Sequence, residues 1–133
     1  MIVVNTNIIA YFVINGTQTA SAQKVFDADP DWSAPQLWKS EMRNVLSLHI
    51  RQKLMTLDEA FIAIDKAEEV ISGREYEVGS HRVIELANAS GCTAYDCEFA
   101  SLAELLNVPL VTFDKKLLAA FPDIAVSIDA FTA

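Results

Sequence analysis

Four polar residues lie next to the predicted ends of strands, and together they could hold a cation: Asn5, Glu41, Asp96 and Asp114. Asn5 ends the apolar run that opens the chain, and Asp114 directly follows a later one. We expect Glu41 and Asp96 in the first turns of two helices. In a parallel sheet these places converge on the carboxyl edge of the strands, where ligands bind. Three carboxylates and an amide gathered there would repel one another without a cation, and hard oxygen ligands suit Mg²⁺ or Mn²⁺.

Taken singly, each of these residues also has an ordinary structural explanation. Acids in the first turn of a helix complement the helix dipole. Thr93, three residues before Asp96, fits a capping box, and Asp114 fits an N-cap. The shared edge of the sheet is therefore the argument for a functional site, and no single residue carries it.

The elements that must position these residues alternate along the chain. Strands are predicted at 2–5, 31–35, 74–78, 109–113 and 124–128. Helices are predicted at 19–28, 36–54, 57–71, 80–90, 93–107 and 115–121, the third opened by a capping box at 56–59 and the fourth closed by Gly91. Residues 8–14 are apolar throughout, a run too short for its period to assign. Alternating strands and helices predict an α/β fold whose parallel sheet is covered on both faces, in a single domain over 1–133.

The composition excludes several classes of protein. With 18 acidic against 10 basic residues the net charge is −8, which argues against wrapping nucleic acid through a basic face but allows an enzyme that touches it locally. No membrane span or secretory signal is predicted, so we expect the cytoplasm. Cys92 and Cys97 match neither a zinc nor a redox pattern, and His49 and His81 lie apart from the acids. No nucleotide-binding motif occurs.

Three stretches of the sequence are VVNTNIIAY, LWKSEMRNVL and TAYDCEFASLAELLNVPLVTFDKKL. In order and spacing they resemble the signature blocks of the PIN-domain family, especially the VapC-like toxins of bacterial toxin–antitoxin pairs. The resemblance covers essentially the whole chain. It implies a three-layer α/β/α fold with a five-stranded parallel sheet of order 3-2-1-4-5. It also implies an endoribonuclease that depends on Mg²⁺ or Mn²⁺.

The resemblance also assigns roles to residues. The family's four acids fall on Asn5, Glu41, Asp96 and Asp114, which would be the catalytic and metal-binding set, and its companion polar residues fall on Asn7 and Thr112. Four basic residues flank this edge and are expected to hold the RNA backbone, although solvated helix charge explains them equally well: Lys39, Arg43, Lys115 and Lys116. The implied partners are a cognate antitoxin protein and a second copy of the chain, with contacts expected around 42–71.

Position 5 departs from the family, which has aspartate there. Asn keeps the shape of the side chain but removes one negative charge, and its NH₂ group cannot ligate a metal, although its carbonyl oxygen can. We therefore expect weakened activity. Two origins fit this residue: a natural loss in a weakened member, or an introduced change that disarms a toxic nuclease.

Two other interpretations stay open at this stage. One is a catalytically inactive PIN-like module that binds a partner protein or RNA. The other is a receiver domain, which also gathers acids around Mg²⁺ but needs an acidic pair after its first strand and a lysine after its last. The first strand here ends in amides, and no lysine follows 124–128.

Overall fold

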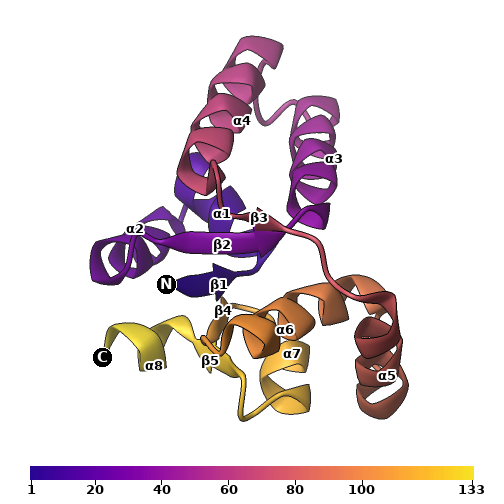
Figure 1. The fold of residues 1–133 in the computed structure, drawn as a ribbon. Coiled ribbons are helices and arrows are strands. Elements are labelled where there is room, and N and C mark those ends of the chain that lie inside the picture. The colour runs from indigo at the N-terminus through magenta and orange to yellow at the C-terminus, as the bar shows by residue number, and fades with distance from the viewer.

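A computed structural model describes residues 1–133, and its centre is a five-stranded parallel sheet (Figure 1). The strands are β1 (Ile2–Val4), β2 (Trp32–Pro35), β3 (Glu75–Tyr76), β4 (Leu110–Thr112) and β5 (Ala125–Ser127). Their order is β3-β2-β1-β4-β5, and every neighbouring pair is parallel. The predicted fold and order are confirmed. This order differs from the 2-1-3-4-5 order of receiver domains, so that interpretation is wrong.

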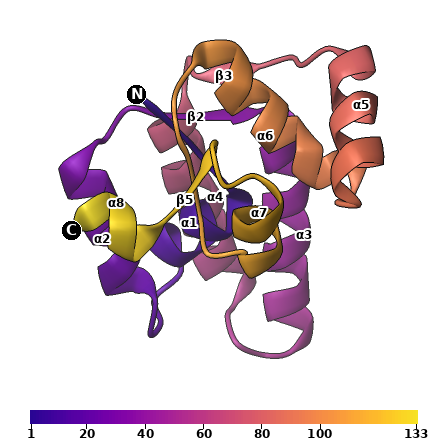
Figure 2. The ribbon, with the colours of Figure 1, turned by 90° about the horizontal axis from the view of Figure 1, so that it is seen from below.

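Eight helices surround the sheet. They are α1 (Thr6–Val13), α2 (Thr19–Ala28), α3 (Leu37–Arg51), α4 (Leu57–Ile71), α5 (Ser80–Ser90), α6 (Ala94–Leu106), α7 (Lys115–Ala120) and α8 (Ile128–Thr132). In Figure 1, α1, α3 and α4 lie on one side of the sheet and α5, α6 and α7 on the other, while α2 lies beside it against α1 and α8. Figure 2 shows the same elements from below. Helices α3 and α4 form a long hairpin that projects beyond the sheet (Figure 1). No helix is both long and apolar enough to cross a membrane.

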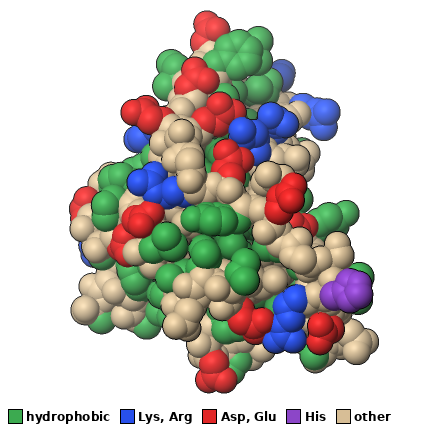
Figure 3. Space-filling view, in the orientation of Figure 1, with side chains coloured by type: hydrophobic (Ala, Val, Ile, Leu, Met, Phe, Trp, Pro, Cys, Tyr) green, Lys and Arg blue, Asp and Glu red, His purple; other side chains and the backbone are tan.

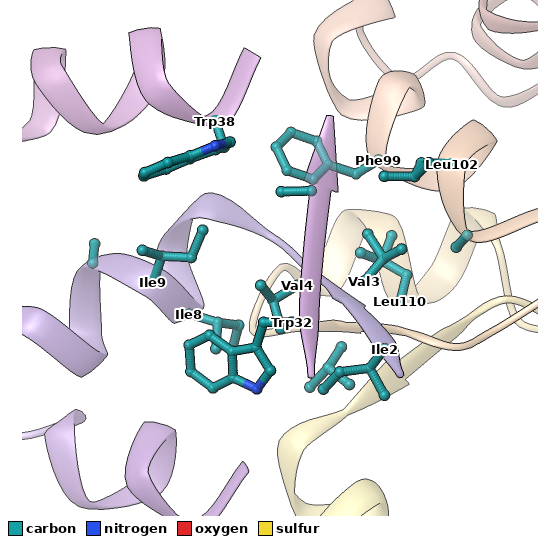
Figure 4. Packing of buried hydrophobic residues seen from close by; sticks show 14 of the residues in the cluster. Ile2, Val3, Val4, Ile8, Ile9, Trp32, Trp38, Phe99, Leu102 and Leu110 are labelled. Atoms are coloured by element: carbon teal, nitrogen blue, oxygen red, sulfur yellow. The ribbon is translucent and has the colours of Figure 1, made fainter. Parts of the chain in front are cut away.

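The core lies between the sheet and both helical layers. Strands β1, β2 and β4 are buried at every position, as expected for a parallel sheet covered on two faces. Figure 4 shows Trp38 of α3 and Phe99 of α6 in the core together with Val3 and Val4 of β1. Both rings are fully buried or nearly so. Trp38 and Phe99 belong to the same core cluster, so α3, which carries Glu41, and α6, which carries Asp96, are both anchored in one core.

Side-chain caps fix five of the eight helix N-termini. Thr56 and Glu59 form the predicted capping box at the start of α4. Gly91 closes α5 in the left-handed conformation, with φ 73°, as its position in the sequence predicts. The undecided run at 8–14 belongs to α1 as far as Val13, Ile14 is the C-cap, and Asn5 is the N-cap.

Most predicted boundaries shift by one to three residues, the strand at 74–78 shrinking to Glu75–Tyr76, and two of the shifts have a clear cause. The helix predicted to run to residue 54 ends at Arg51, because the chain turns through Lys53 with φ 59°. The strand predicted at 124–128 stops at Ser127, whose side chain caps α8 by accepting a hydrogen bond from the Ala130 N–H. Helix α8 was not predicted, since one turn is too short to show a period.

Candidate active site at the carboxyl edge of the sheet

Asn5 lies where β1 passes into α1. Its backbone N–H donates to the Val111 carbonyl at 3.2 Å, so the ends of β1 and β4 lie side by side. Its Oδ1 atom accepts from the Asn7 N–H at 3.5 Å, which is a long capping bond. The amide oxygen of Asn5 thus faces the first turn of α1 at the carboxyl edge of the sheet.

Helix α3 begins at Leu37, so Glu41 lies in its second turn. The prediction that Glu41 lies in the first turn is wrong. The Thr6 hydroxyl donates to Glu41 Oε1 at 2.7 Å. Thr6 is only 5% exposed, so this bond lies in a largely dry environment. Burial raises the pKa of Glu41, the Thr6 hydrogen bond lowers it, and the charges of Asp96 and Glu98 raise it again.

Asp96 lies in the first turn of α6, as predicted. Its backbone N–H donates to Thr93 Oγ1 at 3.1 Å, while the reciprocal bond of a capping box does not form. The Asp96 carboxylate is therefore not used by the cap.

Two buried cysteines flank the start of α6. Cys92 directly precedes the N-cap residue Thr93, and Cys97 lies four residues after it. These are the positions of a hydrophobic staple, which fixes the direction in which the chain enters the helix.

Asp114 caps α7, as predicted, through Oδ1, which accepts from the Lys116 N–H at 2.8 Å. The Asp114 N–H in turn donates to Oγ1 of Thr112 at 3.0 Å. Thr112 is fully buried at the end of β4. The Thr112 side chain therefore holds the backbone of Asp114, while one carboxylate oxygen of Asp114 is not used by the cap.

The acids are brought together in part. The negative charges of Asp96 and Glu98 raise the pKa of Glu41, so α3 and α6 place carboxylates near one another. No three His, Cys, Asp or Glu side chains lie close enough together to form a metal-binding group. The donors at this edge are carboxylate and amide oxygens, the types that Mg²⁺ and Mn²⁺ prefer. Their chemistry fits such an ion, although the side chains do not form a closed cage.

Sequence reasoning missed two residues near this edge, Thr6 and Glu98. Thr6 follows Asn5 directly and its burial could not be read from the sequence. Glu98 is half-buried, and burial raises its pKa. It lies two residues after Asp96, within a helix and away from any strand end, so the rule that selected the other acids passed over it.

The four basic residues differ in their surroundings. Lys39 lies 3.7 Å from Glu75 Oε1, a partly exposed ion pair. Arg43 lines an apolar hollow between α3 and α4. Lys115 and Lys116 are exposed at the start of α7, next to Asp114. Of the four, these two lysines directly follow one of the predicted site acids.

Parallel β1, β2 and β4 with polar groups at their carboxyl ends define an α/β protein of the PIN type. The chain belongs to the PIN domain family, whose model matches residues 2–123. It is 26% identical over 124 residues to Ribonuclease VapC3 of Pyrobaculum aerophilum, covering 91% of this chain and 95% of that protein.

Two solved structures share the fold. The crystal structure of PAE2754 from Pyrobaculum aerophilum has a TM-score of 0.74 and 22% identity, over 98% of this chain and 92% of that one. The structure of FitAB bound to an IR36 DNA fragment has a TM-score of 0.74 and 15% identity, over 96% and 95%. At these identities the likeness concerns the fold alone.

Proposed function

We propose that this chain is a divalent-metal-dependent endoribonuclease, the toxin of a toxin–antitoxin pair, with activity weakened by Asn5. One observation carries the proposal: Glu41, held by Thr6, lies within electrostatic reach of Asp96 at the carboxyl edge of a PIN fold. Similarity to a protein named as a ribonuclease supports RNA as the substrate.

The chain's own residues would prepare a phosphodiester for attack by water. Glu41 and Asp96 are the principal carboxylates for Mg²⁺ or Mn²⁺, with the Asn5 carbonyl oxygen and Asp114 beside them, directly or through water. A bound ion would lower the pKa of a coordinated water and offset charge on the phosphoryl oxygens. Lys115 and Lys116 would hold the RNA backbone, with Arg43 and Lys39 further along the strand.

The proposed partners are an antitoxin protein and a second copy of the chain, and we place their contacts on the α3–α4 hairpin. Four large apolar side chains are more than half exposed there: Leu54, Leu57, Phe61 and Ile62. Figure 3 shows hydrophobic side chains gathered at the end of this hairpin. Exposed apolar patches of this kind mark interaction surfaces. If a second copy binds here, Phe61→Glu will lower the mass measured by light scattering.

The proposed place of action is the cytoplasm, where an RNA-cleaving toxin would find its substrate.

The second candidate function is a catalytically inactive module that binds a partner protein or RNA. Asn5 favours it, as does the lack of any group of three metal-binding side chains. The deciding experiment compares the chain with its Asn5→Asp variant on a panel of structured RNAs, with Mg²⁺, with Mn²⁺ and with EDTA. Cleavage that EDTA blocks, and that the variant performs faster, supports the nuclease. If neither protein cleaves any RNA, the inactive module is the better description.

A further inference from the structure

A second hollow lies next to the acidic edge. It has a volume of about 330 Å³, near the lower end of the range of small-molecule sites. It lies between α1, the turn that joins α1 to α2, and the second half of α3. Its walls are formed by Asn7, Ala10, Tyr11, Ile14, Asn15, Gly16, Thr17, Gln18, Val45 and His49.

Two contacts connect this hollow to the proposed metal edge. Asn7 lines it and lies in the first turn of α1, where its N–H donates to the side chain of Asn5. The Tyr11 ring packs edge-on against Phe113, with ring centroids 4.9 Å apart and an interplanar angle of 88°. Phe113 directly precedes Asp114. A strand whose phosphate lies at the acids could therefore place its neighbouring base in this hollow.

The chemistry of the walls selects a neutral, polar and planar ligand. No Asp, Glu, Lys or Arg lines the hollow, whereas the other four sizeable hollows each include at least one. The amides of Asn15 and Gln18 and the hydroxyl of Thr17 provide both donors and acceptors. Tyr11, 38% exposed, offers a ring for stacking.

Two of these residues each have a side-chain atom that can make a further hydrogen bond. Asn7 Oδ1 is buried and has no hydrogen-bond partner, which is unfavourable unless a ligand or water supplies a donor. His49 Nδ1 lies 2.9 Å from the Val45 carbonyl oxygen, and because a carbonyl can only accept, Nδ1 must donate. In the neutral ring Nε2 is then left as an acceptor.

We propose that this hollow binds one unstacked nucleobase of the RNA strand, next to the phosphate held at the acidic edge. Proteins read single-stranded RNA in this way, by stacking bases on aromatic rings and bonding to their polar edges. The inference rests on the proposed function for the position of the phosphate. It adds a base-reading site that would give the cleavage its sequence preference.

The test uses the metal-free protein and the four ribonucleosides as probes. Adenosine, guanosine, cytidine and uridine are each titrated to tens of millimolar, and the side-chain amide signals of Asn7, Asn15 and Gln18 are followed by NMR. We expect one or two of the nucleosides to shift these signals, and the shifts to saturate as the nucleoside concentration rises. Gln18→Ala and His49→Gln should each weaken that binding by about fivefold, the effect of losing a hydrogen bond.

Matched substitutions outside the hollow serve as controls. Gln52 and His81 are both exposed, and neither lines the hollow, so Gln52→Ala and His81→Gln should bind nucleosides like the parent. The Gln18 side chain makes no capping bond, so its removal spares the fold. The subsite is overturned if no nucleoside moves the three signals, or if the control variants weaken binding equally.

The outcomes separate the subsite from the nuclease. The titration needs neither a metal nor catalysis. Nucleoside binding here without cleavage of any RNA by the Asn5→Asp variant would overturn the nuclease and keep the subsite. If the protein cleaves RNA in a metal-dependent way but none of the four nucleosides binds in the hollow, the subsite alone is overturned.

Discussion

The hydroxyl of Thr6 lies 2.7 Å from Oε1 of Glu41 and joins the start of α1 to the second turn of α3. Thr6 is nearly inaccessible to water, so the carboxylate gains a hydrogen bond where it has lost hydration. The bond opposes the rise in the pKa of Glu41 caused by burial. It also fixes one carboxylate oxygen and leaves Oε2 for a ligand. Thr6 is thus a positioning residue for Glu41.

Replacing Thr6 with Val should remove this bond with little change in shape. The pKa of Glu41 should rise further, because burial is then less opposed. The stability of the metal-free protein should fall by about 1.5–3 kcal/mol at neutral pH, the usual contribution of a hydrogen bond to a charged group. Chemical denaturation in EDTA measures it. Thr6→Ser, which keeps the hydroxyl, should restore most of the loss; a Ser variant as unstable as Val would show that the methyl group matters and the bond does not.

The raised pKa of Glu41 also predicts how stability depends on pH. Between the ordinary value of 4.5 and the raised native value, the folded protein binds more protons than the unfolded chain. The contribution of Glu41 to stability is therefore complete below pH 4.5 and is lost as the pH rises through its native pKa. As the pH rises through this window in EDTA, the melting temperature of the parent should fall relative to that of Glu41→Gln. The Glu41→Gln variant should therefore be the more stable protein at pH 7.

Glu41→Gln should also remove most of the stabilisation by Mn²⁺. A metal that binds only the folded state raises the melting temperature by mass action, and the effect disappears when a principal ligand is lost. Differential scanning fluorimetry with millimolar Mn²⁺ is the measurement. Asp123 is an acid at the opposite edge of the sheet, before the start of β5. Asp123→Asn is therefore the matched control and should respond to Mn²⁺ like the parent. An equal response from Glu41→Gln would place the metal elsewhere.

The two cysteines should act through packing rather than chemistry. Cys92 and Cys97 are buried, and burial raises the pKa of the Cys97 thiol, which keeps it protonated. We expect native protein to react with a thiol reagent much more slowly than unfolded protein. Cys92→Ala should lower the unfolding free energy by about 1 kcal/mol through a weakened staple. Rapid labelling of the native protein would contradict this interpretation.

Much of the fold could be predicted because local signals agree with the tertiary structure. The apolar runs of β1 and β4, the caps at Thr56 and Asp114 and the stop at Gly91 are readable from a few neighbouring residues. The contact between Thr6 and Glu41 is not, since it joins residues 35 apart across two helices. Glu98 likewise could be recognised only from its half-buried position and from its charge, which raises the pKa of Glu41. Sequence patterns identify the edge of the sheet, while packing decides which side chains meet there.

Asn5→Asp is the most informative single change. Asp is as good an N-cap as Asn, so α1 should keep its start. The new carboxylate joins an edge that already holds Glu41 and Asp96, so the metal-free protein should lose a little stability through repulsion. Mg²⁺ should reverse that loss and bind more tightly than in the parent. Asn88→Asp adds the same charge on α5, and its response to Mg²⁺ should stay that of the parent. If both variants respond alike, Asn5 does not contribute to a metal site, and the edge formed by β1 and β4 loses its proposed chemistry.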